Sequence, residues 1–245
     1  RPAPWGSSTL RTMENIQIDG ASPKALEELL THENPEIQKD AACALGDLIR
    51  SKEATALSDS CVESLAKLLG HSNFLVQLEA AIALAEIQDC RGTPLLLAAV
   101  RNKQFRLDAL RAMGTMNDPA TKDELRYWIR KIFAPWADKL QAAAALCKMG
   151  DPDGQTYVQY KVASRKKAER AAAIHFMAEC NHPNALEYLG HIVKDLKDPM
   201  RDVAARSLGL LGNSEAIEVL KDSLVEASPE LISDVNEAIQ LLSRR

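Results

Sequence analysis

Apolar residues along the chain recur at helical spacing in short segments that are separated by polar turns. The stretches 25–30, 62–69 and 216–220 place apolar residues three or four positions apart, as on one face of an α-helix. Turns rich in Asn, Asp and Pro follow, and a second apolar-periodic segment begins after them. The pattern predicts an all-α fold built from pairs of short helices.

The second segment of each pair is repeated along the chain. "NPEIQKDAACALGDL" (34–48) and "DPMRDVAARSLGLLG" (198–212) share a proline, an alanine pair and a Leu-Gly pair in the same order. Such self-similarity at a period of about 30 residues is typical of helical repeat proteins. Seven positions align, and they are Leu45, Leu84, Met113, Leu146, Phe176, Leu208 and Ile239.

The turns and the small residues each have a physical role in this pattern. Asn34, Asn73 and Asp198 are expected to cap the second helices, and Pro35 and Pro199 suit the first helical position. Rows of alanine and glycine let neighbouring helices approach closely. Because one helix pair cannot bury its apolar face alone, the pairs are expected to stack on one another.

The segments 34–48 and 198–212 resemble HEAT repeats, in the short bacterial form related to phycobilisome-lyase-type repeats. The resemblance covers residues 22–243 and implies a right-handed α-solenoid of about seven antiparallel helix pairs, forming a single domain over 13–245. Residues 1–12, "RPAPWGSSTLRT", lack helical periodicity and are expected to be a flexible arm or a remnant of cloning. The resemblance further implies an interaction scaffold.

Composition narrows the classes of function. The chain has no apolar run near the ~18 residues of a membrane span. Its five cysteines form no CxxC pair, and this scattered cysteine pattern favours a reducing, cytoplasmic setting. Deoxyhypusine hydroxylases, which share the HEAT architecture, bind iron through repeated His-Glu pairs, whereas this chain has the single pair His32-Glu33 in a turn. No enzyme activity, metal or cofactor is therefore expected.

The outward stripe of the second helices is the first candidate binding surface. Helical geometry places it on the concave side of a HEAT stack, where apolar residues and arginines could bind a partner protein. The alternative is that the stripe packs against neighbouring second helices as core. The candidate residues are Lys39, Arg50, Leu78, Ile82, Arg111, Arg170, Ile174, Met177 and Arg206.

Charge is divided into blocks that the overall net of −4 conceals. Residues 101–170 carry 15 basic and 8 acidic side chains, whereas both flanking regions are acidic. This basic middle contains "ELRYWIRKIFAPW", a second candidate surface. Its aromatic residues could fill an irregular repeat, bind an acidic protein segment, or stack on nucleic acid. The residues proposed for binding are Arg126, Tyr127, Trp128, Arg130, Lys131 and Trp136.

These observations predict a non-enzymatic scaffold that presents a concave apolar and arginine-containing groove to a protein partner. An acidic segment is one form that this partner could present to the groove. Two alternatives come from other classes. One is a lyase-like accessory subunit that holds a tetrapyrrole, and the other is nucleic-acid binding through the basic middle, as in HEAT-like DNA glycosylases. The net acidity of the whole chain argues against general nucleic-acid binding. The partner and the oligomeric state stay open.

Overall fold

The computed structural model describes residues 18 and 20–244, and these residues form helices and turns without a strand. The predicted arm at residues 1–12 lies outside the described part of the chain. The α-helices are α1 (Pro23–Leu29), α2 (Pro35–Arg50), α3 (Asp59–Leu68), α4 (Phe74–Glu86), α5 (Thr93–Ala99), α6 (Arg106–Met116), α7 (Lys122–Arg130), α8 (Trp136–Lys148), α9 (Pro152–Val162), α10 (Lys167–Glu179), α11 (Ala185–Lys194), α12 (Arg201–Leu211), α13 (Ala216–Asp222) and α14 (Pro229–Ser243). Two 3₁₀ turns, η1 (Cys90–Gly92) and η2 (Pro119–Thr121), precede α5 and α7.

Consecutive helices pair as the sequence predicts, giving seven pairs in the described part of the chain and confirming the all-α solenoid class. Asn34 accepts the N–H of Glu36 at 2.9 Å and Asn73 that of Leu75 at 2.9 Å, so both predicted caps form. Pro35 begins α2. Asp198 and Pro199 instead lie in the turn before α12, which begins at Arg201.

The chain divides into two compact units, with the boundary between Gly92 and Thr93. Unit 1 contains α1–α4. The second helices α2 and α4 pack against each other, α1 packs on α2, and α3 packs on α4. Unit 2 contains α5–α14. The single domain expected over 13–245 stays a prediction.

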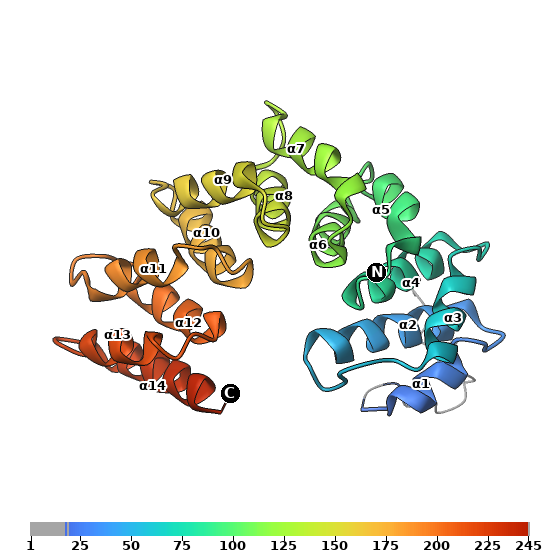
Figure 1. The fold of residues 1–245 in the computed structure, drawn as a ribbon, viewed down its shortest axis with the longest axis horizontal. Coiled ribbons are helices and arrows are strands. Elements are labelled where there is room, and N and C mark those ends of the chain that lie inside the picture. The colour runs from blue at the N-terminus through green and yellow to red at the C-terminus, as the bar shows by residue number, and fades with distance from the viewer. Residues whose placement is uncertain (1–17, 19, 245) are drawn as a thin grey trace, which may run out of the picture. The chain divides into compact units, whose positions relative to one another are not determined.

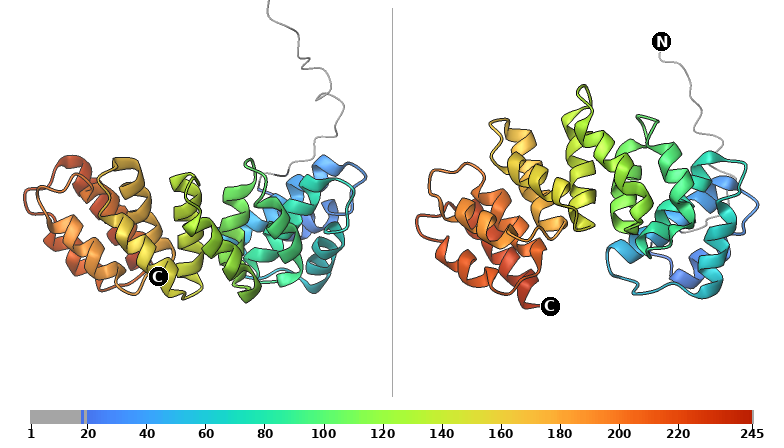
Figure 2. Two further views of the ribbon diagram at one scale, coloured as in Figure 1. Left: turned by 90° about the horizontal axis from the view of Figure 1, so that it is seen from above. Right: turned by 45° about the horizontal axis from the view of Figure 1, so that its top comes forward.

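In unit 2 the helices form two layers, with α5, α7, α9, α11 and α13 in one and α6, α8, α10, α12 and α14 in the other (Figure 1). The second helices pack in series, α6 on α8, α8 on α10, α10 on α12 and α12 on α14. The turned views of Figure 2 show the same succession of helix pairs along unit 2. No helix in the described residues combines the length and apolar character that crossing a lipid bilayer requires.

Small residues bring the second helices together, as predicted from the alanine rows. Ala41, Ala80, Ala142 and Ala204 are fully buried. Among the glycines of the second helices the tightest contact is at Gly114 of α6, where a Cβ atom would lie only 2.6 Å from the Cα of an alanine on α8. Side chains larger than hydrogen therefore do not fit there without moving the helices apart.

The predicted alignment is wrong by one residue in the fifth repeat. Phe176 was expected to match the buried Leu45, but it is only partly buried, and its neighbour Met177 occupies the core. The segment 168–180 is apolar or small around most of the helix, so its sequence period does not fix the buried face.

Candidate functional site

The apolar residues of the predicted concave stripe are core residues. Leu78 and Ile82 of α4 are buried, and so are Ile174 and Met177 of α10. Ile174 and Met177 belong to the core that the serially packed second helices of unit 2 share. The expectation of an exposed apolar band is therefore wrong at these four positions, and the alternative of packed second helices is confirmed for Ile174 and Met177.

Arg170, another residue of the stripe, is part of the internal structure of unit 2. Its Nε donates to the carbonyl oxygen of Val162 at 2.8 Å, and both terminal nitrogens bind the carboxylate of Asp198. The guanidinium thus ties α10 to the end of α9 and to the next interhelical turn. We call this arrangement, an arginine joined to the end of the preceding helix and to the next repeat, a clamp. Arg106 forms one with Val100 O and Asp138, and Arg201 forms one with two carbonyl oxygens, those of Val193 and Ser223.

The other cations of the stripe also have acidic neighbours. Lys39 pairs with Glu36 on its own helix, at 2.6 Å. Arg50 of α2 reaches Glu86 of α4 at 3.1 Å. Arg206 of α12 binds an aspartate on α14 and one on its own helix, and about half of its side chain (49%) is exposed. The pairs Arg50–Glu86 and Arg206–Asp234 join neighbouring helices within a unit, whereas Lys39 pairs along its own helix. A partner-binding role of these cations stays a prediction.

Between α6, α8 and α10 the exposed face is charged rather than apolar. His175 lies 3.5 Å from Glu179, one turn along α10. The hydrogen bond from His175, together with the positive charges of Lys148 and Arg111, holds the pKa of Glu179 below its usual range. This cluster therefore places two basic side chains and one carboxylate beside His175.

The histidines of the interhelical turns have a structural role. In His32, His71 and His182 the Nδ1 atom accepts the backbone N–H of the residue two positions on, at 2.9–3.1 Å. Asn102 and Asn213 accept the same kind of turn bond through a side-chain oxygen. These three histidines are therefore turn residues that hold the backbone between helices.

Two residues of the second candidate surface are also structural. Trp128 is 2% exposed, and its Nε1 donates to Glu124 at 2.8 Å. The Arg106 guanidinium lies 4.3 Å from its ring centroid. Arg126 binds Asp151 at 2.6 Å, on the neighbouring repeat. The predicted place of Trp128 on an exposed binding surface is corrected, because Trp128 is buried. Arg126 is held by carboxylates but is 32% exposed at its side chain, so its binding role stays a prediction.

The turn between α7 and α8 carries an apolar pair that faces solvent. Ile132 is 80% exposed and Phe133 is 94% exposed. Tyr127 and Trp136, from the helices on either side, are partly exposed beside this turn. These four side chains are called the α7–α8 tip below. The sequence reasoning singled out Tyr127 and Trp136 but left Ile132 and Phe133 out of the binding residues.

Cations border the α7–α8 tip. Lys131 places its Nζ 5.2 Å from the ring centroid of Tyr127, and Lys139 donates to the carbonyl oxygen of Ile132 at 3.4 Å. Arg130 is exposed and has one carboxylate contact, with Asp153 at 3.0 Å. The tip therefore combines exposed apolar side chains with a positive border, within the basic block of the sequence.

The turn has a defined conformation. Lys131 donates its N–H to the carbonyl of Tyr127 at 2.9 Å, and the N–H of Ala134 binds the carbonyl of Lys131 at 3.1 Å. Pro135 then fixes the backbone just before α8. Since the turn is ordered before any partner arrives, less conformational entropy is lost on binding.

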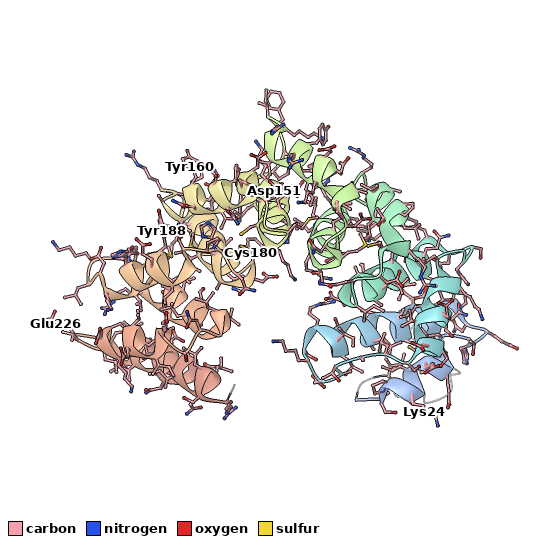
Figure 3. The ribbon with its side chains drawn as sticks, in the orientation of Figure 1. Lys24, Asp151, Tyr160, Cys180, Tyr188 and Glu226 are labelled. Carbon is pink, nitrogen blue, oxygen red and sulfur yellow. The ribbon has the colours of Figure 1, made fainter. Side chains whose placement is uncertain are left out.

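A groove lies beside the tip, between the first helices α7 and α9. It has a volume of about 420 Å³ and is lined by Arg126, Arg130, Asp153, Tyr157 and Tyr160 among others. Figure 3 shows Tyr160 on the side of α9 away from the second helices. In the described residues no three His, Cys, Asp or Glu side chains gather as metal ligands would.

Comparison with known families matches HEAT repeats to two stretches of the chain, residues 22–105 and 158–240. The chain belongs to the HEAT repeat family. The resemblance found in the sequence is thereby confirmed, and the unmatched middle of this HEAT-repeat protein, 106–157, contains the α7–α8 tip. A comparison with curated proteins found no match.

Solved structures match this HEAT-repeat protein at low sequence identity. The complex of CpcE and CpcF of phycocyanin lyase from Nostoc sp. PCC7120 is 18% identical, with 94% of this chain and 99% of that chain covered and a TM-score of 0.51. Human deoxyhypusine hydroxylase is 13% identical, with 91% and 96% covered and a TM-score of 0.41. An archaeal HEAT-like repeats protein from Thermococcus onnurineus NA1 is 17% identical, with 91% and 98% covered and a TM-score of 0.35.

Proposed function

We propose that this HEAT-repeat protein is a non-enzymatic interaction scaffold that binds a partner protein through the α7–α8 tip. The observation that carries the proposal is the nearly complete exposure of Ile132 and Phe133 on an ordered turn. HEAT repeats commonly mediate protein interactions, and exposed apolar side chains with an ordered backbone are typical of binding surfaces.

The border of the tip favours a partner with an acidic segment next to an apolar pocket. Arg130 and Lys131 directly precede Ile132 and Phe133 in the chain, Lys139 contacts the carbonyl oxygen of Ile132, and residues 101–170 are net positive. An acidic segment would complement these charges and raise the association rate, while the apolar pocket would accept Phe133. The predicted concave groove is replaced by this surface, because the apolar residues of the groove are buried.

The contribution of the α7–α8 tip to the binding free energy follows from the apolar area that binding would bury. Full burial of a Phe or Ile side chain contributes about 1.5–3 kcal/mol each. Replacing Ile132 and Phe133 with serine should therefore weaken binding by roughly 3–5 kcal/mol, or about 10²–10⁴-fold in Kd. The free energy of unfolding should change by less than about 0.5 kcal/mol, because both side chains face solvent.

The test compares two sets of variants against the wild-type chain. The first is Ile132→Ser combined with Phe133→Ser, and the control is Leu196→Ser, a half-exposed apolar residue in the corresponding turn between α11 and α12. A partner recovered with the wild-type chain from its native cells is purified, and its Kd is measured for each variant. We expect only the double variant to lose affinity.

Equal affinity of the wild-type and double-variant chains would refute the tip as the binding surface. The two other classes of function give different results in the same preparation. A tetrapyrrole-holding subunit would bind free bilin with a visible absorbance change, and a nucleic-acid binder would bind any oligonucleotide with a steep dependence on salt. Either result would replace the scaffold proposal.

A further inference from the structure

Two buried cysteines of unit 2 lie close together. Cys147 is in α8 and Cys180 caps the C-terminal end of α10, where Figure 3 labels it. Their Sγ atoms are 2.6 Å apart, within roughly 0.6 Å of the S–S bond length of about 2.05 Å. Both are free thiols, and both are almost fully buried. The fold therefore brings two thiols from neighbouring repeats to bridging distance.

A small cavity gives access to one member of the pair. It has a volume of about 10 Å³ and is lined by Cys180 together with Arg111, Lys148 and Glu179. That volume holds about one water-sized molecule. A peroxide is close to this size, whereas a glutathione-sized oxidant is far larger. The approach to Cys180 therefore favours a small oxidant.

We infer that Cys147 and Cys180 are a covalent modification site, where a hydroperoxide converts the two thiols into a disulfide that cross-links the fourth and fifth repeats. Cys180 lines the cavity and is oxidised first, and Cys147 is the resolving thiol. The three other cysteines, Cys43, Cys61 and Cys90, are spread over unit 1. The inference is independent of the proposed binding function.

The two steps balance with hydrogen peroxide as the oxidant. In the first, the Cys180 sulfur attacks one peroxide oxygen, the O–O bond breaks, and sulfenic acid and one water form. In the second, the Cys147 sulfur attacks the Cys180 sulfur, the S–O bond breaks, and a second water leaves with the thiol proton. The two thiols lose two electrons in total, and the peroxide gains them.

The surroundings of the pair make the reaction slow. Contact with the Cys147 thiol, burial and the negative charge of Glu179 all raise the pKa of Cys180. Since the thiolate is the reactive form, a raised pKa slows the oxidation of the pair by low concentrations of peroxide. The cross-link is therefore expected under sustained peroxide and not in a freshly reduced sample.

The experiment maps thiols in the full chain after peroxide treatment. The protein is incubated with hydrogen peroxide, denatured, alkylated and digested, and the linked peptides are identified by mass spectrometry. We expect one linked pair joining Cys147 to Cys180, with the intact mass lowered by about 2 Da for the two hydrogens lost. The thermal midpoint should rise by roughly 5–10 °C, and a thiol reductant should reverse both changes.

Two single variants separate this site from other thiols. Cys147→Ala should abolish both the linked peptide and the rise in the midpoint, while Cys90→Ala, at an exposed thiol outside the pair, should keep both. Complete alkylation of Cys147 and Cys180 after peroxide treatment of the wild-type chain would overturn the inference. Linkage of either residue only to a second chain would overturn it as well.

Discussion

Replacing Gly114 with alanine tests how closely the second helices of unit 2 must approach. An added Cβ would lie 2.6 Å from the Cα and 2.7 Å from the Cβ of Ala145 on α8. These atoms belong to a helix backbone and its first side-chain carbon, so they cannot turn aside. Gly46 is the matched position in unit 1, where an added Cβ would lie 3.4 Å from its nearest neighbour, the Cα of Ala83.

The two substitutions should have opposite effects on stability. Alanine is about 1 kcal/mol more favourable than glycine inside a helix. At Gly114, overpacking of up to about 3 kcal/mol outweighs this gain, so Gly114→Ala should destabilise the protein by roughly 2 kcal/mol. At Gly46 the contact is ordinary, so Gly46→Ala should stabilise by up to about 1 kcal/mol.

The assay is thermal and chemical denaturation followed by circular dichroism, with hydrogen exchange to locate the change. At about 2–4 °C per kcal/mol, Gly114→Ala should lower the midpoint by roughly 4–8 °C. Exchange should become faster in α6 and α8, the two helices that contact at this point. A midpoint for Gly114→Ala equal to or above that of Gly46→Ala would refute the close packing of α6 on α8.

Two further predictions concern the turns and clamps of unit 2. Arg170→Ala should destabilise the protein by roughly 2–4 kcal/mol, because it leaves the Asp198 carboxylate, 11% exposed at its side chain, without its cationic partner. Arg206→Ala, at a half-exposed arginine, should cost less than about 1 kcal/mol. Similar denaturation midpoints for the two variants would contradict the structural role of Arg170. Burial lowers the pKa of His182, whose Nε2 contacts the carbonyl of Gln155 at 3.2 Å. As the pH falls below about 7, the unfolded chain therefore binds more protons than the folded chain, and the free energy of unfolding should decrease toward pH 5. His182→Asn, which can keep the turn bond, should flatten this slope between about pH 7 and 5 in denaturation series, and an unchanged slope would show that other groups cause it.

The helix pairs and their small-residue contacts could be predicted from the sequence because they depend on local pattern. Asn34 and Asn73 cap helices through neighbours two residues away, and the alanine rows need only a helical period. The register of α10 could not be predicted in the same way. Apolar and small residues surround most of that helix, so either Phe176 or Met177 suits the core by period alone.

The residues of the candidate sites were harder to predict from the sequence, because the burial of their side chains depends on contacts between repeats. Arg170 was expected to face a partner, but its carboxylate partner Asp198 is 28 residues away and joins it only in the folded stack. Trp128 and Phe133 stand in one aromatic run, yet α7 ends at Arg130, so the first is buried against its repeat and the second extends into solvent. Where the helix ends decides which aromatic residue can bind a partner.

The central claim, that the α7–α8 tip binds a partner protein, is tested most directly by site-specific photocrosslinking in native cells. A photoreactive phenylalanine analogue is placed at Phe133 and, as the control, at Leu196 in the corresponding turn between α11 and α12. We predict one defined protein adduct from position 133, lost when Arg130 and Lys131 are both changed to glutamate, and none from position 196. Absence of a protein adduct at position 133, or the same adduct from both positions, would contradict the claim.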